Sequence, residues 1–181
     1  MIINEYTPPR RQRLAYAPPK LHQHLWKIPR KGILLSPRNG ESLHMIVCGV
    51  EIKGKEAILC LVQRSPDGSV HIKSDIKKLA LIEERDARSL VNMKSSIEAF
   101  AHQNGLGAFV IKTRQSSGIL ASGGTTFKIE ALFQLSGTPV VFVSPPALSA
   151  FAKGNLGGVP SSVVGYQADA YRAGAWHLAK T

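Results

Sequence analysis

One short apolar segment that contains a single acid constrains the fold of this chain most. Residues 46–52 read IVCGVEI, and every position except Glu51 is apolar or glycine. A strand that is apolar on both faces belongs at the centre of a sheet that is covered on both sides. A buried carboxylate is costly unless it is paired, hydrated or bound to a metal. The segment therefore predicts a central strand in which Glu51 needs a partner.

The pattern that follows predicts a mixed sheet. Tight turns at KGK and SPDG separate the first three strands, and helical spacing then alternates with further strands. The strands are predicted at 45–52, 56–64, 69–74, 107–113 and 138–144. The helices are predicted at 83–105, 122–136, 145–154 and 165–180. Since helical crossovers join parallel strands, we expect an α/β fold: a five-stranded mixed sheet in β-β-β-α-β-α-β-α order, with helices on both faces.

The first 44 residues differ from the rest in composition. They hold eight lysines and arginines against two acids, and prolines at positions 8, 9, 18, 19, 29 and 37. Proline at this density prevents regular helices and central strands. We therefore predict a basic, extended or disordered arm over 1–44 and a folded domain over 45–181. An unstructured leader, or a translation start at Met45, is the alternative.

The charge of the chain favours a polyanionic partner. The net charge is +11, and both the arm and the remainder are basic. Such a balance promotes binding to nucleic acid through counterion release, without distinguishing DNA, RNA or a hybrid. No segment approaches the roughly 20 apolar residues that span a bilayer, and no signal-peptide core opens the chain. We expect a cytoplasmic protein that does not bind membranes, with a homodimer as an open alternative.

The two cysteines lie in the first two predicted strands. If the chain turns back about Gly54, Cys48 falls opposite Cys60. A redox pair is then an alternative to two free buried thiols, which a cytoplasmic setting favours.

Five segments carry a resemblance to a known fold: CGVEIKGKEAIL, FVIKTR, FKIEALFQL, VVFVSPPAL and YQADAYRAGAW. In this order, with an acid on the first strand, they are similar to the ribonuclease H-like superfamily. The chain resembles in particular a small uncharacterised bacterial family related to the RuvC-type Holliday junction resolvases. The resemblance covers most of residues 45–181 and leaves the arm outside.

The resemblance implies a metal-dependent nuclease, a hydrolase that uses Mg²⁺ or Mn²⁺ held by carboxylates. The acids of such a site come from the first strand, the fourth strand and the last helix. Glu51 and Asp169 match the first and last positions, as catalytic residues and metal ligands. Glu130 is a candidate for a further metal ligand, and Glu56 is another. Oxygen ligands without a His/Cys cluster suit Mg²⁺ or Mn²⁺ better than zinc.

The fourth strand departs from the family pattern. It ends in Lys112, Thr113 and Arg114, where relatives carry an acid. Neither lysine nor threonine replaces a carboxylate ligand, and a nearby lysine repels a metal cation. Weak or absent nuclease activity is therefore favoured, and whether the chain is an enzyme stays open. Salt bridges from the two acids to Lys112 and Arg114 would argue against a metal centre.

Cationic and glycine-rich positions are candidates for contacts to nucleic acid. Gly123 and Gly124 lead into a helix whose first N–H groups are free to bind phosphate, with Lys128 one turn inside. The predicted nucleic-acid contacts are Lys112, Arg114, Gly123, Gly124 and Lys128 in the domain, and Arg10, Arg11 and Arg13 in the arm.

Each acid also has a purely structural explanation. Glu51 would pair with Lys53, Lys55 or Arg114, and Asp169 would complement the helix dipole and meet Arg172 at i+3. We therefore keep two functions: a RuvC-like protein that binds structured nucleic acid, as a metal-dependent nuclease with a degenerate site, or a non-catalytic nucleic-acid or ribonucleoprotein interaction subunit. A kinase or ATPase is disfavoured because paired phosphate loops are missing.

Overall fold

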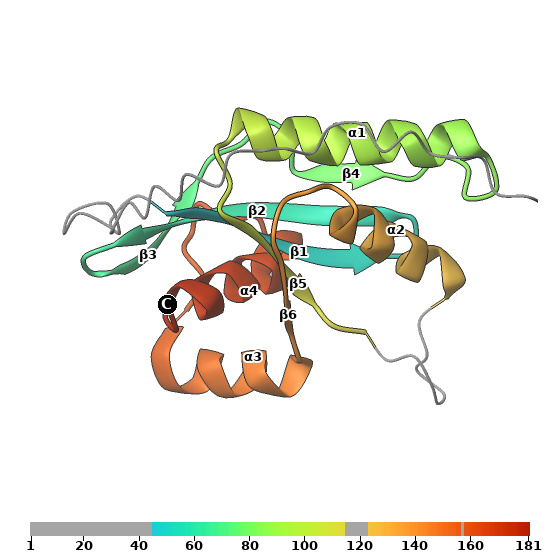
Figure 1. Cartoon of the computed structure of the whole chain (residues 1–181). Coiled ribbons are helices and arrows are strands. Elements are labelled where there is room, and N and C mark those ends of the chain that lie inside the picture. Colours follow the sequence, from blue (N-terminus) through green and yellow to red (C-terminus); the bar gives the residue numbers. More distant parts are fainter. Residues whose placement is uncertain (1–44, 115–122, 157) are drawn as a thin grey trace, which may run out of the picture. The chain divides into compact units, whose positions relative to one another are not determined.

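The computed structural model describes residues 45–114, 123–156 and 158–181, which form a mixed α/β domain (Figure 1). The sheet has six strands in the order β3-β2-β1-β5-β6, and β4 pairs with β2 beside β3. The predicted mixed sheet with helices on both faces is confirmed. The predicted arm, residues 1–44 with Arg10, Arg11 and Arg13, lies outside the described residues.

The elements follow the order expected from the sequence, with one additional strand. The strands are β1 (Ile46–Lys53), β2 (Glu56–Ser65), β3 (Gly68–Ile72), β4 (Lys78–Ala80), β5 (Ala108–Lys112) and β6 (Val140–Val143). The helices are α1 (Ala87–Gln103), α2 (Gly124–Gln134), α3 (Pro145–Phe151) and α4 (Ala168–Leu178). A π-helical turn, Ala152–Leu156, follows α3, and a 3-10 turn, Gly165–Gln167, precedes α4. No helix in the described part of the chain is both long and apolar enough to cross a membrane.

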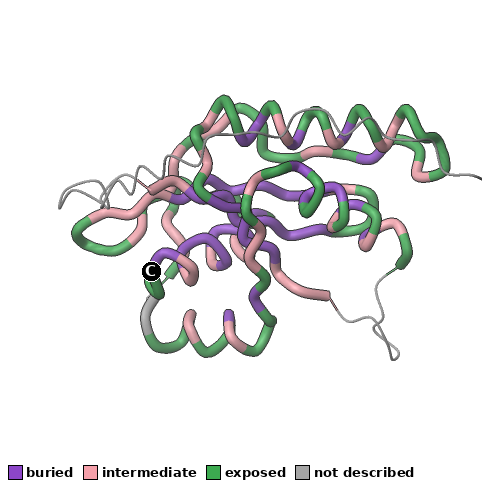
Figure 2. Tube along the Cα trace, in the orientation of Figure 1, coloured by how far each residue is buried: buried purple, intermediate pink, exposed green. Residues whose placement is uncertain are grey.

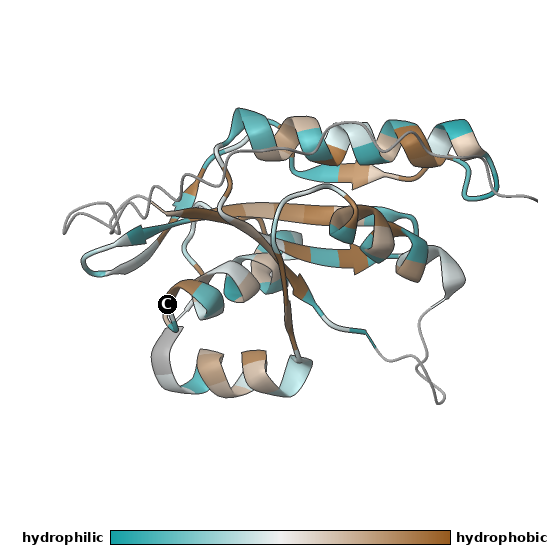
Figure 3. Ribbon diagram, viewed as in Figure 1, coloured by the Kyte–Doolittle hydropathy of each residue, from teal (hydrophilic) through white to brown (hydrophobic). Residues whose placement is uncertain are grey.

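Two hydrophobic cores lie on the two faces of the sheet. One core contains Met93 of α1 and Phe133 of α2, and the other contains Leu148 of α3 and Tyr171 of α4. Figure 2 shows that burial is concentrated along the central strands and α4. Figure 3 shows hydrophobic residues along much of the same strands. The central strand β1 is covered on both sides, as its apolar sequence predicts.

The sheet contains a strand, β4, that the sequence pattern did not predict. β4 pairs with the first three residues of β2, and β3 pairs with the last five on the same edge. Leu59 lies between them, and its N–H donates to the carbonyl of Lys77 at 2.9 Å. The carbonyl of Leu59 accepts a hydrogen bond of 2.6 Å from Nε2 of Gln167, a side chain that is 2% exposed. Gln167 therefore supplies a hydrogen-bond donor to β2 between the residues that pair with β4 and those that pair with β3. This contact connects the start of α4 to the sheet.

The predicted pairing of the two cysteines is wrong by one residue. Cys48 lies opposite Leu61, and Cys60 lies opposite Gly49. The turn has two residues, with Gly54 at a φ of 58°, so its centre falls after Gly54 rather than on it. Because side chains alternate along a strand, the thiols face opposite cores. Both are free and buried, and burial raises the pKa of the Cys60 thiol to about 12.

Helix α4 packs directly on the backbone of β1. A Cβ atom on Gly49 would lie 1.7 Å from the carbonyl oxygen of Ala170, and one on Gly174 would lie 2.7 Å from Cγ2 of Val62. Only glycine permits an approach this close. The contact fixes the first turn of α4, which carries Asp169, on the face of the sheet that Gly49 occupies.

Candidate functional site

Glu51 and Lys112 occupy equivalent positions on two parallel strands. Val47 lies beside Ala108 and Gly49 beside Val110. Two residues further along each strand, the same register places Glu51 beside Lys112. Alternate residues of a strand point to the same face, so both charged side chains lie on the face that α3 and α4 cover. Nζ of Lys112 donates a hydrogen bond of 3.1 Å to Oε1 of Glu51, which is 4% exposed.

The same ammonium group reaches the acid of the last helix. Nζ of Lys112 also donates to Oδ2 of Asp169, at 2.5 Å. We refer to Glu51, Lys112 and Asp169 as the lysine bridge. Each acid of the lysine bridge also has a second cationic partner outside it. Nζ of Lys53 lies 3.1 Å from Oε2 of Glu51, and Nη1 of Arg172 donates to Oδ1 of Asp169 at 2.8 Å. The structural partners predicted at Lys53 and Arg172 are confirmed.

The contacts in the lysine bridge stabilise its charged forms. Partial burial opposes ionisation of Asp169, but hydrogen bonds and charges from Lys112 and Arg172 outweigh it and lower the pKa of this carboxyl group. Burial likewise opposes the charge of Lys112, but hydrogen bonds to Asp169 and Glu51 outweigh it and raise the pKa of the ammonium group. Asp169 and Lys112 therefore remain an ion pair across the neutral range.

A family model described as "Protein of unknown function (DUF3010)" matches residues 45–176. The chain belongs to this family. The matched region runs from the residue before β1 into α4, so it contains all of the lysine bridge of this DUF3010 chain. The comparison with curated proteins finds no match.

Solved structures similar to this DUF3010 chain include two of RuvC. The Thermus thermophilus RuvC structure is 12% identical with a TM-score of 0.56, and the match covers 74% of this chain and 93% of RuvC. T. thermophilus RuvC in complex with a Holliday junction substrate is 14% identical with a TM-score of 0.51, and the match covers 74% and 92%. At these identities the likeness shows the fold, which confirms the predicted ribonuclease H-like class.

The side chains at the lysine bridge do not fit a divalent metal ion. An ammonium group already contacts both Glu51 and Asp169, at the position that a shared cation would need. Together with Lys53 and Arg172, three cations face these two carboxylates. Within 45–114, 123–156 and 158–181, no group of three or more His, Cys, Asp or Glu side chains is placed to hold a metal. The salt bridges of Lys112 with both acids are those expected to argue against a metal centre, whereas Arg114 interacts with Glu51 only through its charge.

The other predicted metal ligands are not grouped with Glu51 and Asp169. Burial raises the pKa of Glu130, and the charge of Arg114 opposes this shift. Arg114 interacts electrostatically with both Glu130 and Glu51. Glu56 pairs with Lys78 at 2.9 Å on the edge of β2. Glu130 therefore shares a cationic neighbour, Arg114, with Glu51. Among the described residues, no group of three or more His, Cys, Asp or Glu side chains would let Glu130 share a metal with the lysine bridge.

The predicted glycine-led helix is present as α2. Gly123 is its N-cap, Gly124 is its first residue, and neither has a side chain to satisfy the first N–H groups. Nζ of Lys128 donates to the carbonyl of Glu84 at 3.0 Å. Contacts of these three positions with nucleic acid stay predictions, as do those of Lys112 and Arg114.

A cavity of about 290 Å³ opens beside the lysine bridge, between the end of β5, α3, the π-helical turn and α4. Its lining residues are Lys112, Pro145, Leu148, Ser149, Ala152, Lys153, Asp169 and Arg172. The sequence did not single out Lys153, which follows α3 in the chain. Its proximity to Lys112 arises only when the chain folds.

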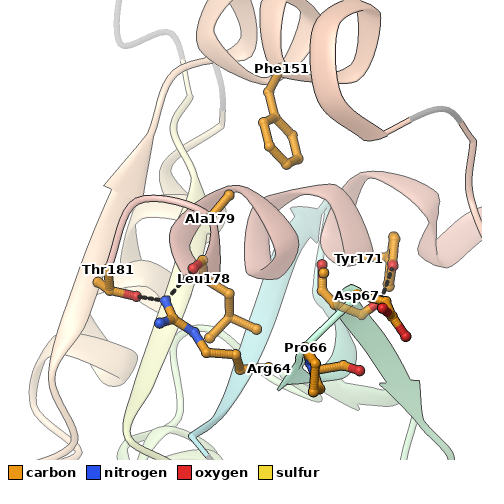
Figure 4. A pocket seen from close by; sticks show the side chains of 11 residues that line it. Arg64, Pro66, Asp67, Phe151, Tyr171, Leu178, Ala179 and Thr181 are labelled. Carbon is orange, nitrogen blue, oxygen red and sulfur yellow. Dashed lines mark hydrogen bonds between the residues drawn. The ribbon is translucent and has the colours of Figure 1, made fainter. Parts of the chain in front are cut away.

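A larger cavity, of about 560 Å³, lies between the β2–β3 turn and the end of α4 (Figure 4). Here Nη2 of Arg64 donates to the carbonyl of Leu178 and to Oγ1 of Thr181, and the hydroxyl of Tyr171 donates to the carbonyl of Ser69. These polar groups hold the hairpin against α4. The polar groups of the 560 Å³ cavity are therefore used for contacts within the protein. The 290 Å³ cavity beside the lysine bridge is the better candidate for a ligand site.

Proposed function

We propose that this protein binds structured nucleic acid and does not cleave it by metal-dependent hydrolysis. The observation that carries the proposal is the position of Lys112. Its ammonium group lies between the two carboxylates that a metal-dependent site would use. A cation tethered to the chain neutralises both acids and competes with any metal ion for the same oxygens. The site is then suited to holding a nucleic-acid backbone rather than activating water.

The choice of nucleic acid as partner is supported by charge and by fold. The chain carries a net charge of +11, and cations outnumber carboxylates at the lysine bridge. A surface of this kind attracts phosphate groups and releases counterions when it binds them. RuvC, which has the same fold, has been solved in complex with a Holliday junction substrate.

A metal-dependent nuclease is the second candidate. It is favoured by the convergence of Glu51 and Asp169, from β1 and α4, on one point. Nuclease activity would require Lys112 to leave that point, and cleavage assays distinguish the two candidates.

Binding can be measured with the full chain in the presence of EDTA. We expect a fluorescently labelled four-way DNA junction to bind more tightly than a linear duplex of the same sequence. Affinity should fall steeply with salt, because roughly 0.9 counterions are released for each phosphate neutralised. Fluorescence anisotropy over a salt series measures both effects. The proposal is wrong if neither the junction, the duplex nor an RNA–DNA hybrid binds at low salt.

The arm is tested in the same assay. Replacing Arg10, Arg11 and Arg13 together with alanine should make the salt dependence shallower by up to about 3 in the slope of log K against log salt. An unchanged slope would contradict a role for these arginines in binding.

A further inference from the structure

The lining of the cavity beside the lysine bridge combines three cations and one carboxylate, Asp169, with apolar side chains. The cations are Lys112, Lys153 and Arg172, and the apolar residues are Pro145, Leu148 and Ala152. Its volume of about 290 Å³ is close to the ~300 Å³ at which small-molecule sites begin. The cavity therefore suits one small ligand that carries both an anionic group and an apolar body.

The charges around the cavity are unbalanced. At the lysine bridge, Lys53, Lys112 and Arg172 face Glu51 and Asp169, which leaves one positive charge in excess. Lys153 adds a second, since it is exposed and no carboxylate pairs with it in the part of the chain that the structure describes. An excess of two positive charges matches the charge of a phosphate monoester near neutral pH.

The cations also have donors to spare. The ammonium group of Lys112 has three N–H donors and uses one each for Glu51 and Asp169. Arg172 has five, of which one on Nη1 is used for Asp169; its Nε is buried and is not accessible to a ligand, so the spare donors are those of the two Nη atoms. Ser149, an exposed residue of α3 with a hydroxyl group, also lines the cavity. Charge-assisted hydrogen bonds from such groups to phosphate oxygens are short and strong.

We propose that this cavity binds the phosphate of a single nucleotide unit, with the sugar or base against Pro145, Leu148 and Ala152. The proposal deepens the proposed function, and it rests on that function for the choice of a nucleotide over other phosphate monoesters. The nucleotide has two sources, a free nucleoside monophosphate or the phosphorylated 5′ end of a strand.

Titration calorimetry of the full chain separates the two sources. The probes are deoxyadenosine monophosphate against deoxyadenosine, and a short single-stranded oligonucleotide with and without a 5′-phosphate. We expect the phosphate to increase the affinity about tenfold or more in at least one pair, the size of effect that one charged hydrogen bond gives. A preference confined to the oligonucleotide pair identifies the strand end as the ligand.

A matched pair of variants tests the location. Ser149→Asp places a carboxylate in the cavity wall, and Ser95→Asp adds the same charge to an exposed position of α1 on the opposite face of the sheet. Both serines are exposed, so both variants are expected to fold. Ser149→Asp should abolish the preference for the phosphate, and Ser95→Asp should keep it within about twofold because the charge is screened over that distance.

The outcomes distinguish this proposal from the proposed function. The cavity proposal is overturned if the junction binds but neither probe pair shows a phosphate preference, or if both aspartate variants lose the preference equally. If the monophosphate binds and the junction does not, the cavity proposal holds and the proposed function fails. If neither binds, both are overturned.

Discussion

Replacing Lys112 with methionine is expected to lower the free energy of unfolding by about 2–3 kcal/mol. The change keeps the apolar stem but removes the cation that Glu51 and Asp169 share. Breaking a fully buried pair costs about 3–5 kcal/mol, and the cost is smaller here because Lys53 and Arg172 remain and Lys112 is partly exposed. Urea denaturation of the two proteins at pH 7 measures the difference.

A control and a metal titration complete this experiment. Lys94→Met removes an ammonium group that pairs with Glu98 on the surface of α1, and it should cost less than about 1 kcal/mol. Mn²⁺ or Mg²⁺ should raise the denaturation midpoint of Lys112→Met more than that of the wild type, because only the variant leaves both acids without their shared cation. An equal response of the two proteins would show that Lys112 does not block the carboxylates.

The contribution of Lys112 should also depend on pH in a defined way. Because the pKa of Asp169 is lowered in the folded state, this group stabilises the fold at pH values above its ordinary pKa of about 3.9. The stabilisation is lost as pH falls through the lowered pKa. The raised pKa of Lys112 stabilises the fold below about 10.4, and this is lost as pH rises through the raised value. We expect a constant difference between wild type and Lys112→Met from about pH 5 to pH 9. A step near pH 7 would contradict this assignment.

Gly49→Ala is expected to have the largest effect on stability, a loss of about 3 kcal/mol or more. The added Cβ would lie 1.7 Å from the carbonyl oxygen of Ala170, which is a backbone atom and cannot rotate away. Helix α4 must therefore move from β1, and Asp169 moves away from Lys112 with it. Denaturation measures the first effect, and junction binding at a temperature where the variant is folded measures the second.

Gly124→Ala is the matched control for this change. A Cβ at Gly124, the first residue of α2, meets nothing within 4 Å. The substitution should leave stability unchanged or raise it by up to about 1 kcal/mol, because alanine restricts the unfolded chain. If Gly49→Ala were as stable as Gly124→Ala, the close packing of α4 on β1 would be wrong.

The architecture could be predicted because its signals are local. The apolar run at β1, the turns around β2 and the helical spacing in α1 each fix an element from a few neighbouring residues. β4 was missed because Lys78–Ala80 is too short to show a period, and its pairing with β2 depends on how the preceding loop folds. The predicted register of the two cysteines was wrong because a turn of two residues and a turn of three residues look alike in sequence.

The site could be predicted only in part. Lys53 and Arg172 were identified as partners because they lie two and three positions from the acids that they contact. The pairing of Glu51 with Lys112 was detectable in principle, since each lies at or near the end of an apolar run and the two runs are parallel neighbours. The contact of Lys112 with Asp169 was named only as one possible outcome, because it depends on the docking of α4 against Gly49, which the sequence does not show.

A cleavage assay tests the role of Lys112 most directly. The wild-type chain, Glu51→Gln and Lys112→Met are each incubated with Mg²⁺ or Mn²⁺ and either a labelled four-way junction or an RNA–DNA hybrid, and bound and cut substrate are resolved on gels. We expect the wild type to bind the substrates and to yield no product with either metal. We expect Glu51→Gln to yield no product either. A metal-dependent product from the wild type that disappears in Glu51→Gln would show that the site is a nuclease and that Lys112 does not replace the metal.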